Sequence, residues 1–335
     1  MAATTLPSAG LDWRDDDLLG APFEQAPLGP ATLVRLRPTP DDVAAARGVV
    51  LHVHGYNDYF FHAHLARAFA DAGYLFHAVD LRAAGRSLRP GQTPHYVTDL
   101  REQGSDVAAA SAALRAAYPL PLVAHAHSTG GLTTSLWAHA HRHATGTAAG
   151  PDALVLDSPF LELPGSEFGR AVGTRVLDRL GSLRPLTALS HGPSWYATAL
   201  LRENGGRWEF DTTLKRPDGV PARAGWLRAV RRAQARVARG LAIACPVLLA
   251  ASAASSRDAP DNPLVDSTDT VLDVEQIVAR APRLGRDVTV LRIEGGVHDL
   301  ALSADGPRQA YLDAVLGWLA TALRPAVDLT TERTA

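Results

Sequence analysis

Residues 122–131 read Leu-Val-Ala-His-Ala-His-Ser-Thr-Gly-Gly, an apolar run that ends at a serine between small residues. A helix-compatible segment, Leu132 to His143, follows. A strand, a sharp turn that carries a serine and then a helix are the layout of a nucleophile elbow. Such a turn crowds the backbone, so the positions two before and two after the serine must be small, and Ala126 and Gly130 are small. The stretch predicts that Ser128 is a nucleophile, with an ordinary helix N-cap serine as the alternative.

Strand and helix patterns alternate on both sides of this stretch. The alternation runs from Gly48 to Leu156, stops at Phe160, and resumes at Ala244. It predicts an α/β fold with a mostly parallel, doubly wound sheet covered by helices on both faces. Four segments follow from it: 1–159 as the first part of the core, 160–241 as an inserted helical cap, 242–324 as the second part of the core, and 325–335 as a disordered tail.

The segment 160–241 shows helical patterns at Gly169 to Leu180, Trp195 to Leu201 and Ala224 to Ala238, but no clear buried strand. A separate helical domain is the alternative to a cap. About 80 residues with few apolar stripes are few for an independent core, so the cap is preferred. The segment Met1 to Leu18 is expected to be a poorly ordered arm that ends in packing by Trp13.

Composition limits the classes of protein that fit. Apolar residues make up 46% and charged residues 20% of the 335 residues, as expected for a globular chain with a large core. The net charge of -2 gives no argument for binding nucleic acid or a membrane surface. Cys245 is the only cysteine, which excludes an intrachain disulfide. No signal peptide or membrane span is visible, so a cytoplasmic location is expected.

A serine hydroxyl needs an adjacent base to take its proton, and a histidine late in the chain is the expected base. Among the 13 histidines, His298 alone combines a preceding strand pattern, a Gly-rich loop and a following helix pattern. It is therefore the predicted base, with a surface loop histidine as the alternative.

The acid that orients this histidine should follow the strand pattern that ends at Ala251. The loop after that strand is long, so distance from the strand does not select one residue. Asp269 is preferred because it precedes an apolar pair and the next helix pattern, whereas Asp273 could be the N-cap of that helix. The acids in this region are Asp258, Asp261, Asp266, Asp269 and Asp273.

An acyl-transfer site also needs two backbone N–H groups to stabilise the developing oxyanion. The residue after the nucleophile, Thr129, supplies one in an elbow of this kind. The second is expected from the loop after an earlier strand, where Gly55 allows a close turn and Tyr56 follows.

At these residues the chain resembles the α/β-hydrolase superfamily, and within it the monoacylglycerol-lipase and serine-aminopeptidase-like (lysophospholipase-like) branch. The departures from the family pattern are Ala126 in place of glycine and the long loop before Asp269. The matching segments are His54-Gly55-Tyr56-Asn57-Asp58, Asp80-Leu81-Arg82-Ala83-Ala84-Gly85-Arg86-Ser87, Ala126-His127-Ser128-Thr129-Gly130-Gly131 and Gly296-Val297-His298-Asp299.

The resemblance implies a serine hydrolase that cleaves a small apolar carboxylic ester, such as a monoacylglycerol or lysophospholipid, through an acyl-enzyme. An amidase, a peptidase or an acyltransferase with the same residues is an alternative, as is a non-catalytic ligand-binding homologue. No cofactor is expected, because no phosphate- or dinucleotide-binding motif follows a strand. No metal is expected either, since no carboxylate-rich cluster is visible beside the paired histidines His52 and His54 or His125 and His127. The expected partner is a small-molecule ester, and the pattern does not address the oligomeric state.

Overall fold

In the computed structural model, the structure describes residues 10–163, 176–189 and 192–323. Within these residues nine strands form one sheet, in the order β1-β2-β3-β5-β4-β6-β7-β8-β9. The strands are β1 (Arg14–Asp15), β2 (Phe23–Leu28), β3 (Ala31–Leu36), β4 (Gly48–Val53), β5 (Tyr74–Asp80), β6 (Leu122–His127), β7 (Ala153–Asp157), β8 (Val247–Ser252) and β9 (Val288–Ile293).

The sheet is parallel from β5 to β9 and antiparallel at its β1–β3 end. Strands β4, β5, β6, β7 and β8 are buried along their whole length. Their near-continuous apolar sequences are what a parallel strand covered on both faces requires. The predicted mostly parallel, doubly wound sheet is therefore confirmed.

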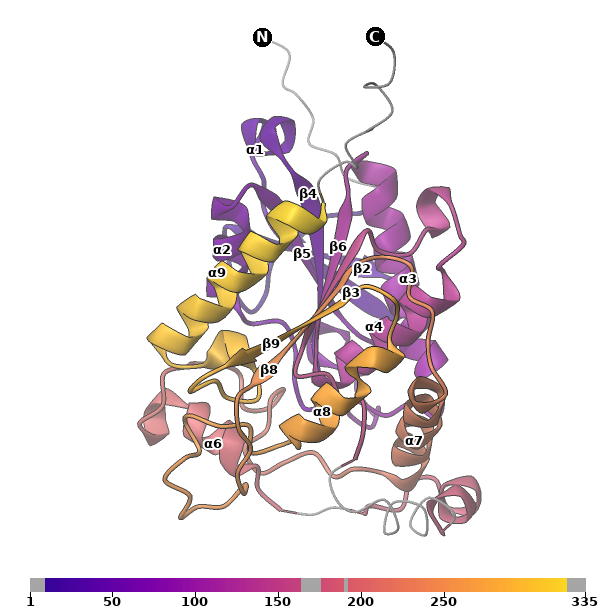
Figure 1. Ribbon diagram of the computed structural model, residues 1–335, viewed down its shortest axis with the longest axis vertical. Coiled ribbons are helices and arrows are strands. Elements are labelled where there is room, and N and C mark those ends of the chain that lie inside the picture. The colour runs from indigo at the N-terminus through magenta and orange to yellow at the C-terminus, as the bar shows by residue number, and fades with distance from the viewer. Residues whose placement is uncertain (1–9, 164–175, 190–191, 324–335) are drawn as a thin grey trace, which may run out of the picture.

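Helices cover both faces of the sheet (Figure 1). On one face α2 and α9 pack through Phe69 and Tyr311 against Val50 and Val123 of the sheet. On the other face α3, α4, α7 and α8 contribute to a second core with Leu51 and Leu249. The helices that lie wholly within the described residues are α1 (Pro40–Ala45), α2 (Ala63–Asp71), α3 (Leu100–Ala117), α4 (Ser128–Ala140), α6 (Trp195–Leu200), α7 (Ala224–Ala238), α8 (Val274–Arg280) and α9 (Asp305–Ala322). Residues 176–183 are helical as well. Short 3-10 turns are η1 (Gly85–Ser87), η2 (Gly146–Ala148), η3 (Arg202–Asn204), η4 (Ala281–Arg283) and η5 (Leu300–Leu302).

Residues 1–9 of the expected N-terminal arm lie outside the described residues. Trp13 packs as expected, with the Arg35 guanidinium 4.1 Å from its ring centre, but the residues after it are more ordered than an arm. Arg14 and Asp15 form β1 and pair with β2, and the next residue, Asp16, is buried. Both Asp16 carboxylate oxygens accept hydrogen bonds from the Arg86 guanidinium, at 2.5 and 2.7 Å. A two-residue strand is too short to leave a periodic pattern, and Arg86, which binds Asp16, lies 70 positions later in the chain, so the sequence could not reveal this arrangement.

The segment between β7 and β8 contains helices and no strand of the main sheet within its described residues. Helices α6 and α7 confirm two of the expected helical patterns. The third, Gly169 to Leu180, lies partly outside the described residues, as does the whole expected tail 325–335. In Figure 1, α6 and α7 lie on opposite sides of the lower end of the sheet, with α8 between them. That placement brings this segment to the end of the sheet where β6 passes into α4.

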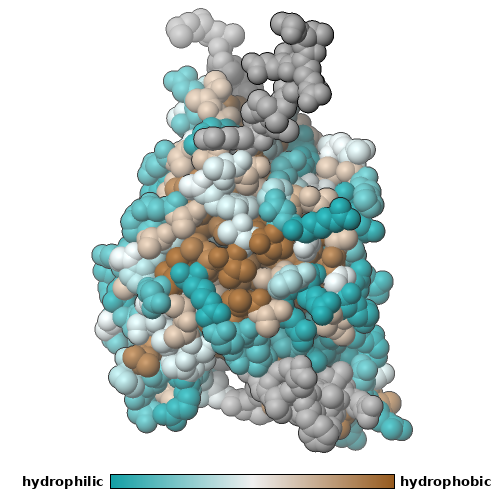
Figure 2. Space-filling view, in the orientation of Figure 1, coloured by the Kyte–Doolittle hydropathy of each residue, from teal (hydrophilic) through white to brown (hydrophobic). Residues whose placement is uncertain are grey.

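Strand β9 is the outermost strand at its end of the sheet. Figure 2 shows an apolar patch in the middle of the face seen in Figure 1, over this strand, where Val290 is 41% exposed. No helix in the described ranges combines the length and the apolar composition needed to cross a bilayer.

Candidate active site

The turn between β6 and α4 places Ser128 at the first position of the helix with a φ of 52°, in the left-handed region. A Cβ atom at Gly130 would lie 2.3 Å from the carbonyl oxygen of His54, and one at Gly131 would lie 2.9 Å from Pro159 Cβ. The helix can therefore pass β4 and the loop after β7 only with glycine at these positions. The methyl group of Ala126 packs fully buried in the core, so the departure from glycine there is accommodated.

Ser128, His298 and Asp269 form a chain of hydrogen bonds. Each residue follows a different strand: Ser128 follows β6, His298 follows β9 and Asp269 follows β8. The Ser128 hydroxyl lies 3.1 Å from His298 Nε2, and His298 Nδ1 lies 2.9 Å from Asp269 Oδ2. The other oxygen, Asp269 Oδ1, accepts the Val271 and Leu272 amides at 2.8 Å each. With Nδ1 protonated toward the carboxylate, Nε2 is free to accept the serine proton.

The other acids in the loop are engaged elsewhere. Asp258 accepts the Tyr196 amide at 2.8 Å, and Asp266 forms an ion pair with Arg207 at 2.6 Å. Asp273 is the N-cap of α8 and accepts the Glu275 and Gln276 amides, while Asp261 lies 3.9 Å from Arg257 at the surface. Of the five acids considered from the sequence, the structure brings Asp269 to His298.

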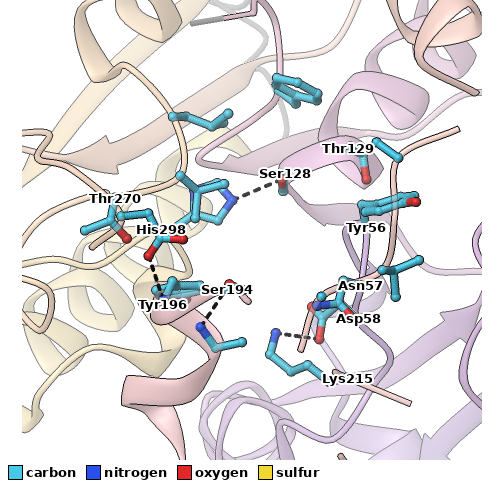
Figure 3. Close-up of a pocket in the computed structure, with 18 of the residues that line it drawn as sticks. Tyr56, Asn57, Asp58, Ser128, Thr129, Ser194, Tyr196, Lys215, Thr270 and His298 are labelled. Carbon is cyan, nitrogen blue, oxygen red and sulfur yellow. Dashed lines mark hydrogen bonds and ion pairs between the residues drawn. The ribbon is translucent and has the colours of Figure 1, made fainter. Parts of the chain in front are cut away.

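The two residues expected to supply the oxyanion donors, Tyr56 and Thr129, lie on one side of Ser128, and His298 lies on the other (Figure 3). Thr129 is the second residue of α4, and amides of the first turn have no partner within their own helix. The Tyr56 amide makes no hydrogen bond to another described residue. A Cβ atom at Gly55 would lie 3.0 Å from Ser128 Cβ and 3.2 Å from His127 Cδ2. Glycine there is what allows the Tyr56 loop to approach the serine.

The Tyr56 loop is also bound to the segment between β7 and β8. The Tyr56 hydroxyl donates to the Pro221 carbonyl at 3.2 Å. The Asn57 side chain donates to the Arg216 carbonyl at 2.9 Å and accepts the Arg216 amide at 2.8 Å. The position of the Tyr56 amide therefore depends on residues about 160 positions later in the chain.

A cavity of about 530 Å³ opens at Ser128. One part of its wall is apolar, with Phe160, Trp226, Leu227 and Leu272. Another part is polar, with Asp58, His127 and Lys215, and Figure 3 shows Asp58 and Lys215 together on one side of Ser128. The cavity thus offers one apolar and one polar region beside the same hydroxyl.

Sequence analysis missed the buried polar cluster behind this polar wall. Lys215 Nζ donates to Asp58 Oδ1 at 2.9 Å, and His62 Nε2 and Asp299 Oδ2 are 2.9 Å apart. The two ring nitrogens of His127 lie 4.0 Å from Asp157 and 4.0 Å from Asp299. The one lysine in the sequence was the signal that could have drawn attention to it.

Burial and the neighbouring groups shift the pKa values of the side chains in this cluster. Burial acts to raise the pKa of Asp299, but His127 and His62 outweigh it and hold that pKa well below its usual range. Burial, together with the Asp299 carboxylate, raises the pKa of Asp157 well above its usual range. Burial lowers the pKa of His127 to about 4, so its imidazole is neutral at pH 7. Of these two neighbouring carboxyl groups, Asp299 therefore loses its proton more readily than Asp157.

Two groups in this cluster have ligand atoms within 4.8 Å of one another, as a metal site needs: Asp58 with His62 and Asp299, and His127 with Asp157 and Asp299. No carboxylate-rich cluster was expected beside His52, His54, His125 and His127, and for His127 that expectation is wrong. Asp157 is the last residue of β7, and Asp58 and Asp299 follow β4 and β9. These strands lie far apart in sequence, and their carboxyl ends meet at one end of the sheet. The Lys215 ammonium already supplies positive charge to the first group.

Comparisons with known proteins agree with this fold. Among curated protein sequences, none matches the chain. A monoacylglycerol lipase from Paleococcus ferrophilus is similar in structure, with a TM-score of 0.61 and 20% sequence identity over 82% of this chain and 95% of that chain. A soluble variant of monoglyceride lipase from Saccharomyces cerevisiae has a TM-score of 0.60 and 16% identity over 95% of this chain and 97% of that chain. A carboxyl esterase from Bacillus coagulans has a TM-score of 0.58 and 14% identity, over 94% and 99%.

These structural likenesses confirm the α/β-hydrolase fold expected from the sequence. A family model described as serine aminopeptidase, S33 matches residues 44–304, which is most of the chain and includes all of the residues brought together at Ser128. The chain belongs to the serine aminopeptidase S33 family of the α/β-hydrolase superfamily.

Proposed function

We propose that the protein is a serine hydrolase that cleaves small carboxylic esters through an acyl-enzyme. The observation that carries this proposal is the hydrogen-bonded chain of Ser128, His298 and Asp269 at the wall of a cavity. The lipases and the carboxyl esterase that share the fold support an ester as the substrate. The apolar part of the cavity wall is suited to an acyl chain.

In the proposed mechanism His298 takes the Ser128 proton as the hydroxyl oxygen attacks the ester carbonyl. The amides of Tyr56 and Thr129 donate to the oxyanion of the tetrahedral intermediate, and removal of one such donor costs about 3 kcal/mol in comparable sites. His298 then protonates the leaving alcohol, while Asp269 holds the imidazole in the required tautomer. Water then attacks the acyl-enzyme with His298 as the base, and the acid product leaves as Ser128 is regenerated.

We further propose that residues 160–241 act as a cap over this site. Residues of this segment, including Phe160, Tyr196, Lys215 and Trp226, line the cavity. A cap can select substrates by shape and exclude water from the acyl-enzyme. The cytoplasmic location expected from the sequence stays a prediction.

Peptide or amide cleavage is the second candidate, because the family carries the description serine aminopeptidase. An ester is preferred because an alkoxide leaves with less help than an amine. Matched nitrophenyl ester and nitroanilide pairs with the same acyl group distinguish the two reactions. An ester-to-anilide ratio in kcat/KM near one or below would favour the amidase.

The direct test is labelling by a fluorophosphonate probe, followed by an acyl-chain-length series of nitrophenyl esters. We expect stoichiometric labelling of Ser128, and loss of labelling and of turnover in Ser128→Ala. A folded wild-type protein that is neither labelled nor active would show a non-catalytic ligand-binding member of the family instead.

A further inference from the structure

Strand β9 leaves one edge of the sheet open. Because it is the last strand, its outer side has no neighbouring strand among the described residues. The apolar patch of Figure 2 lies over this strand, and residues 288–291 read Val-Thr-Val-Leu, with neither a charge nor a proline. Proteins that stay monomeric usually block a sheet edge of this kind with charges, proline or a bulge. The open edge of β9 is therefore a template for pairing with another strand.

The backbone groups that face outward on β9 can be identified from its pairing with β8. The carbonyl groups of Asp287 and Ile293 accept the amides of Val247 and Ala253 on the β8 side. In a parallel ladder, the residues bonded to one neighbouring strand alternate with those that face away from it. The odd-numbered residues of β9 therefore face β8. The residues whose amide and carbonyl groups face outward, with no hydrogen-bond partner among the described residues, are Val288, Val290 and Arg292.

These outward groups fit a second copy of the same strand that runs in the opposite direction. With a two-fold axis at Val290, the two copies of Val290 form a hydrogen-bonded pair. Val288 of each copy then lies opposite Arg292 of the other. All three pairs use outward-facing backbone groups, so the pairing adds hydrogen bonds and breaks none to β8.

Charges at the two ends of β9 favour this register. Arg286 and Glu294 flank the strand, both are exposed, and within the described part of the chain neither forms an ion pair. The axis at Val290 places Arg286 of each copy opposite Glu294 of the other, on the same face of the sheet. An axis one position earlier would place Arg286 opposite Arg292, and an axis one position later would place Glu294 opposite a valine. Arg292 already has an acid, because it pairs with Glu275 of its own chain.

We propose that the protein forms a two-fold symmetric dimer in which β9 pairs antiparallel with β9 of a second copy, about an axis at Val290. A second copy is the fitting occupant because the hydrogen-bonding groups, the valines and the end charges of this edge complement themselves under the same two-fold rotation. The pairing covers the exposed Val290 side chain and extends the sheet across both copies. None of the paired residues lines the cavity at Ser128, so the dimer and the proposed function can fail independently.

Sedimentation equilibrium of the full chain is the first test. We expect twice the mass of one chain at micromolar concentrations, with dissociation on dilution. Val290→Pro removes an outward amide that is not bonded to β8, and proline is tolerated at such positions on edge strands. This variant is expected to be monomeric, with the circular dichroism spectrum of wild type. A monomeric wild-type protein would overturn the proposal.

A charge swap tests the register, and it does not depend on whether the proline variant folds. Arg286→Glu places two acids opposite each other at both ends of the strand pair and should raise the dimer dissociation constant by about tenfold or more. Arg286→Glu combined with Glu294→Arg restores opposite charges and should return that constant to within about threefold of wild type. Arg67→Glu on α2, which packs on β5 at the other end of the sheet, changes the net charge equally and should have no effect. A dimer that Arg286→Glu leaves intact, or that the swap does not restore, would contradict this interface.

Amide hydrogen exchange gives a second measurement on the same proteins. In the wild-type dimer the Val290 amide should exchange slowly, and in Arg286→Glu it should exchange fast at the same concentration. The Thr289 and Leu291 amides, which face β8, should stay slow in both. Equal exchange at Val290 would show that the dimer, if present, uses another surface.

Residues 324–335, which follow α9, are the other candidate to cover this edge. The chain truncated after Leu323 is expected to dimerise as the full chain does. Dimerisation that appears only after the truncation would assign the β9 edge to these residues and overturn the second copy as its occupant.

Discussion

At the scale of single residues, the proposed site depends on groups whose neighbours fix them in one geometry. Asp269 is fully buried and is held through Oδ1 by two backbone amides, so that Oδ2 faces His298. Gly55 and Ser128 approach so closely that no side chain fits between them. Both features give predictions that a substitution can test.

Asp269→Asn is predicted to lower kcat for nitrophenyl esters by about 10³- to 10⁴-fold, because an amide in place of the carboxylate favours the wrong imidazole tautomer. Steady-state kinetics measure this effect. Asp266→Asn is the control, since Asp266 pairs with Arg207 at the surface, and it should stay within about threefold of wild type. If Asp258→Asn abolished turnover while Asp269→Asn did not, the proposed acid would be wrong.

Gly55→Ala is predicted to lower kcat by about 10- to 100-fold, with KM less affected. The new methyl group would lie 3.0 Å from Ser128 Cβ, so the Tyr56 amide must move away from the oxyanion. Gly104→Ala in α3 is a matched control, because its Cβ would meet no atom within 4 Å. This control should keep full activity and gain about 0.5–1 kcal/mol in the free energy of unfolding. Wild-type kcat in Gly55→Ala would argue against Tyr56 as a donor.

At the scale of elements, the contact between α4 and β4 sets the position of the elbow. The α4 backbone passes the carbonyl groups of Val53 and His54 so closely that a Cβ at Gly130 would lie 2.7 and 2.3 Å from their oxygens. Backbone atoms cannot move aside as the end of a flexible side chain can. If Gly130 were replaced by a residue with a Cβ atom, α4 would have to shift or the turn at Ser128 would have to open.

Gly130→Ala is therefore predicted to destabilise the fold by about 3 kcal/mol or more, a magnitude typical of severe overpacking. Urea-induced unfolding followed by circular dichroism measures the change. Ala126→Gly is the comparison at the other flank of the serine, and should cost about 1 kcal/mol through loss of a buried methyl group while activity is kept. A Gly130→Ala protein as stable as wild type would show that α4 can move relative to β4.

At the scale of the whole molecule, buried histidines link stability to pH. Burial lowers the pKa of these side chains, so they stay neutral in the folded chain while the unfolded chain takes up protons below about pH 6.5. The stability they contribute is full above that pH and is lost as the pH falls toward the folded pKa values. Asp157 and Asp258, whose pKa values are raised by burial, act in the opposite direction. The histidines with pKa values lowered to about 3 or about 4 are His64, His77, His95, His125 and His127.

The free energy of unfolding is therefore predicted to fall steeply between pH 7.5 and pH 5.0. His77 alone, with its pKa lowered to about 3, should account for about 2 kcal/mol of that fall. Urea unfolding at the two pH values measures the difference, and His77→Phe should reduce it by that amount. His143→Gln serves as the control, because the His143 side chain is exposed. A His77→Phe protein with the wild-type difference would contradict the assignment of this pH dependence to buried imidazoles.

The sequence by itself determined the alternation of strands and helices, the serine in the turn after β6 and the choice of His298 among the histidines. These features leave a local pattern, because burial on both faces of a strand and the crowding of a tight turn restrict the residues at neighbouring positions. The choice among the acids of the loop after β8 and the polar cluster around Asp299 were decided only by the tertiary structure. Asp58 and Lys215 are 157 positions apart, and His62 and Asp299 are 237 positions apart. The order of strands in the sheet brings the segments after β4 and β9 together, and the segment between β7 and β8 brings Lys215 to the same place. Neither arrangement leaves a mark in the sequence around any one residue.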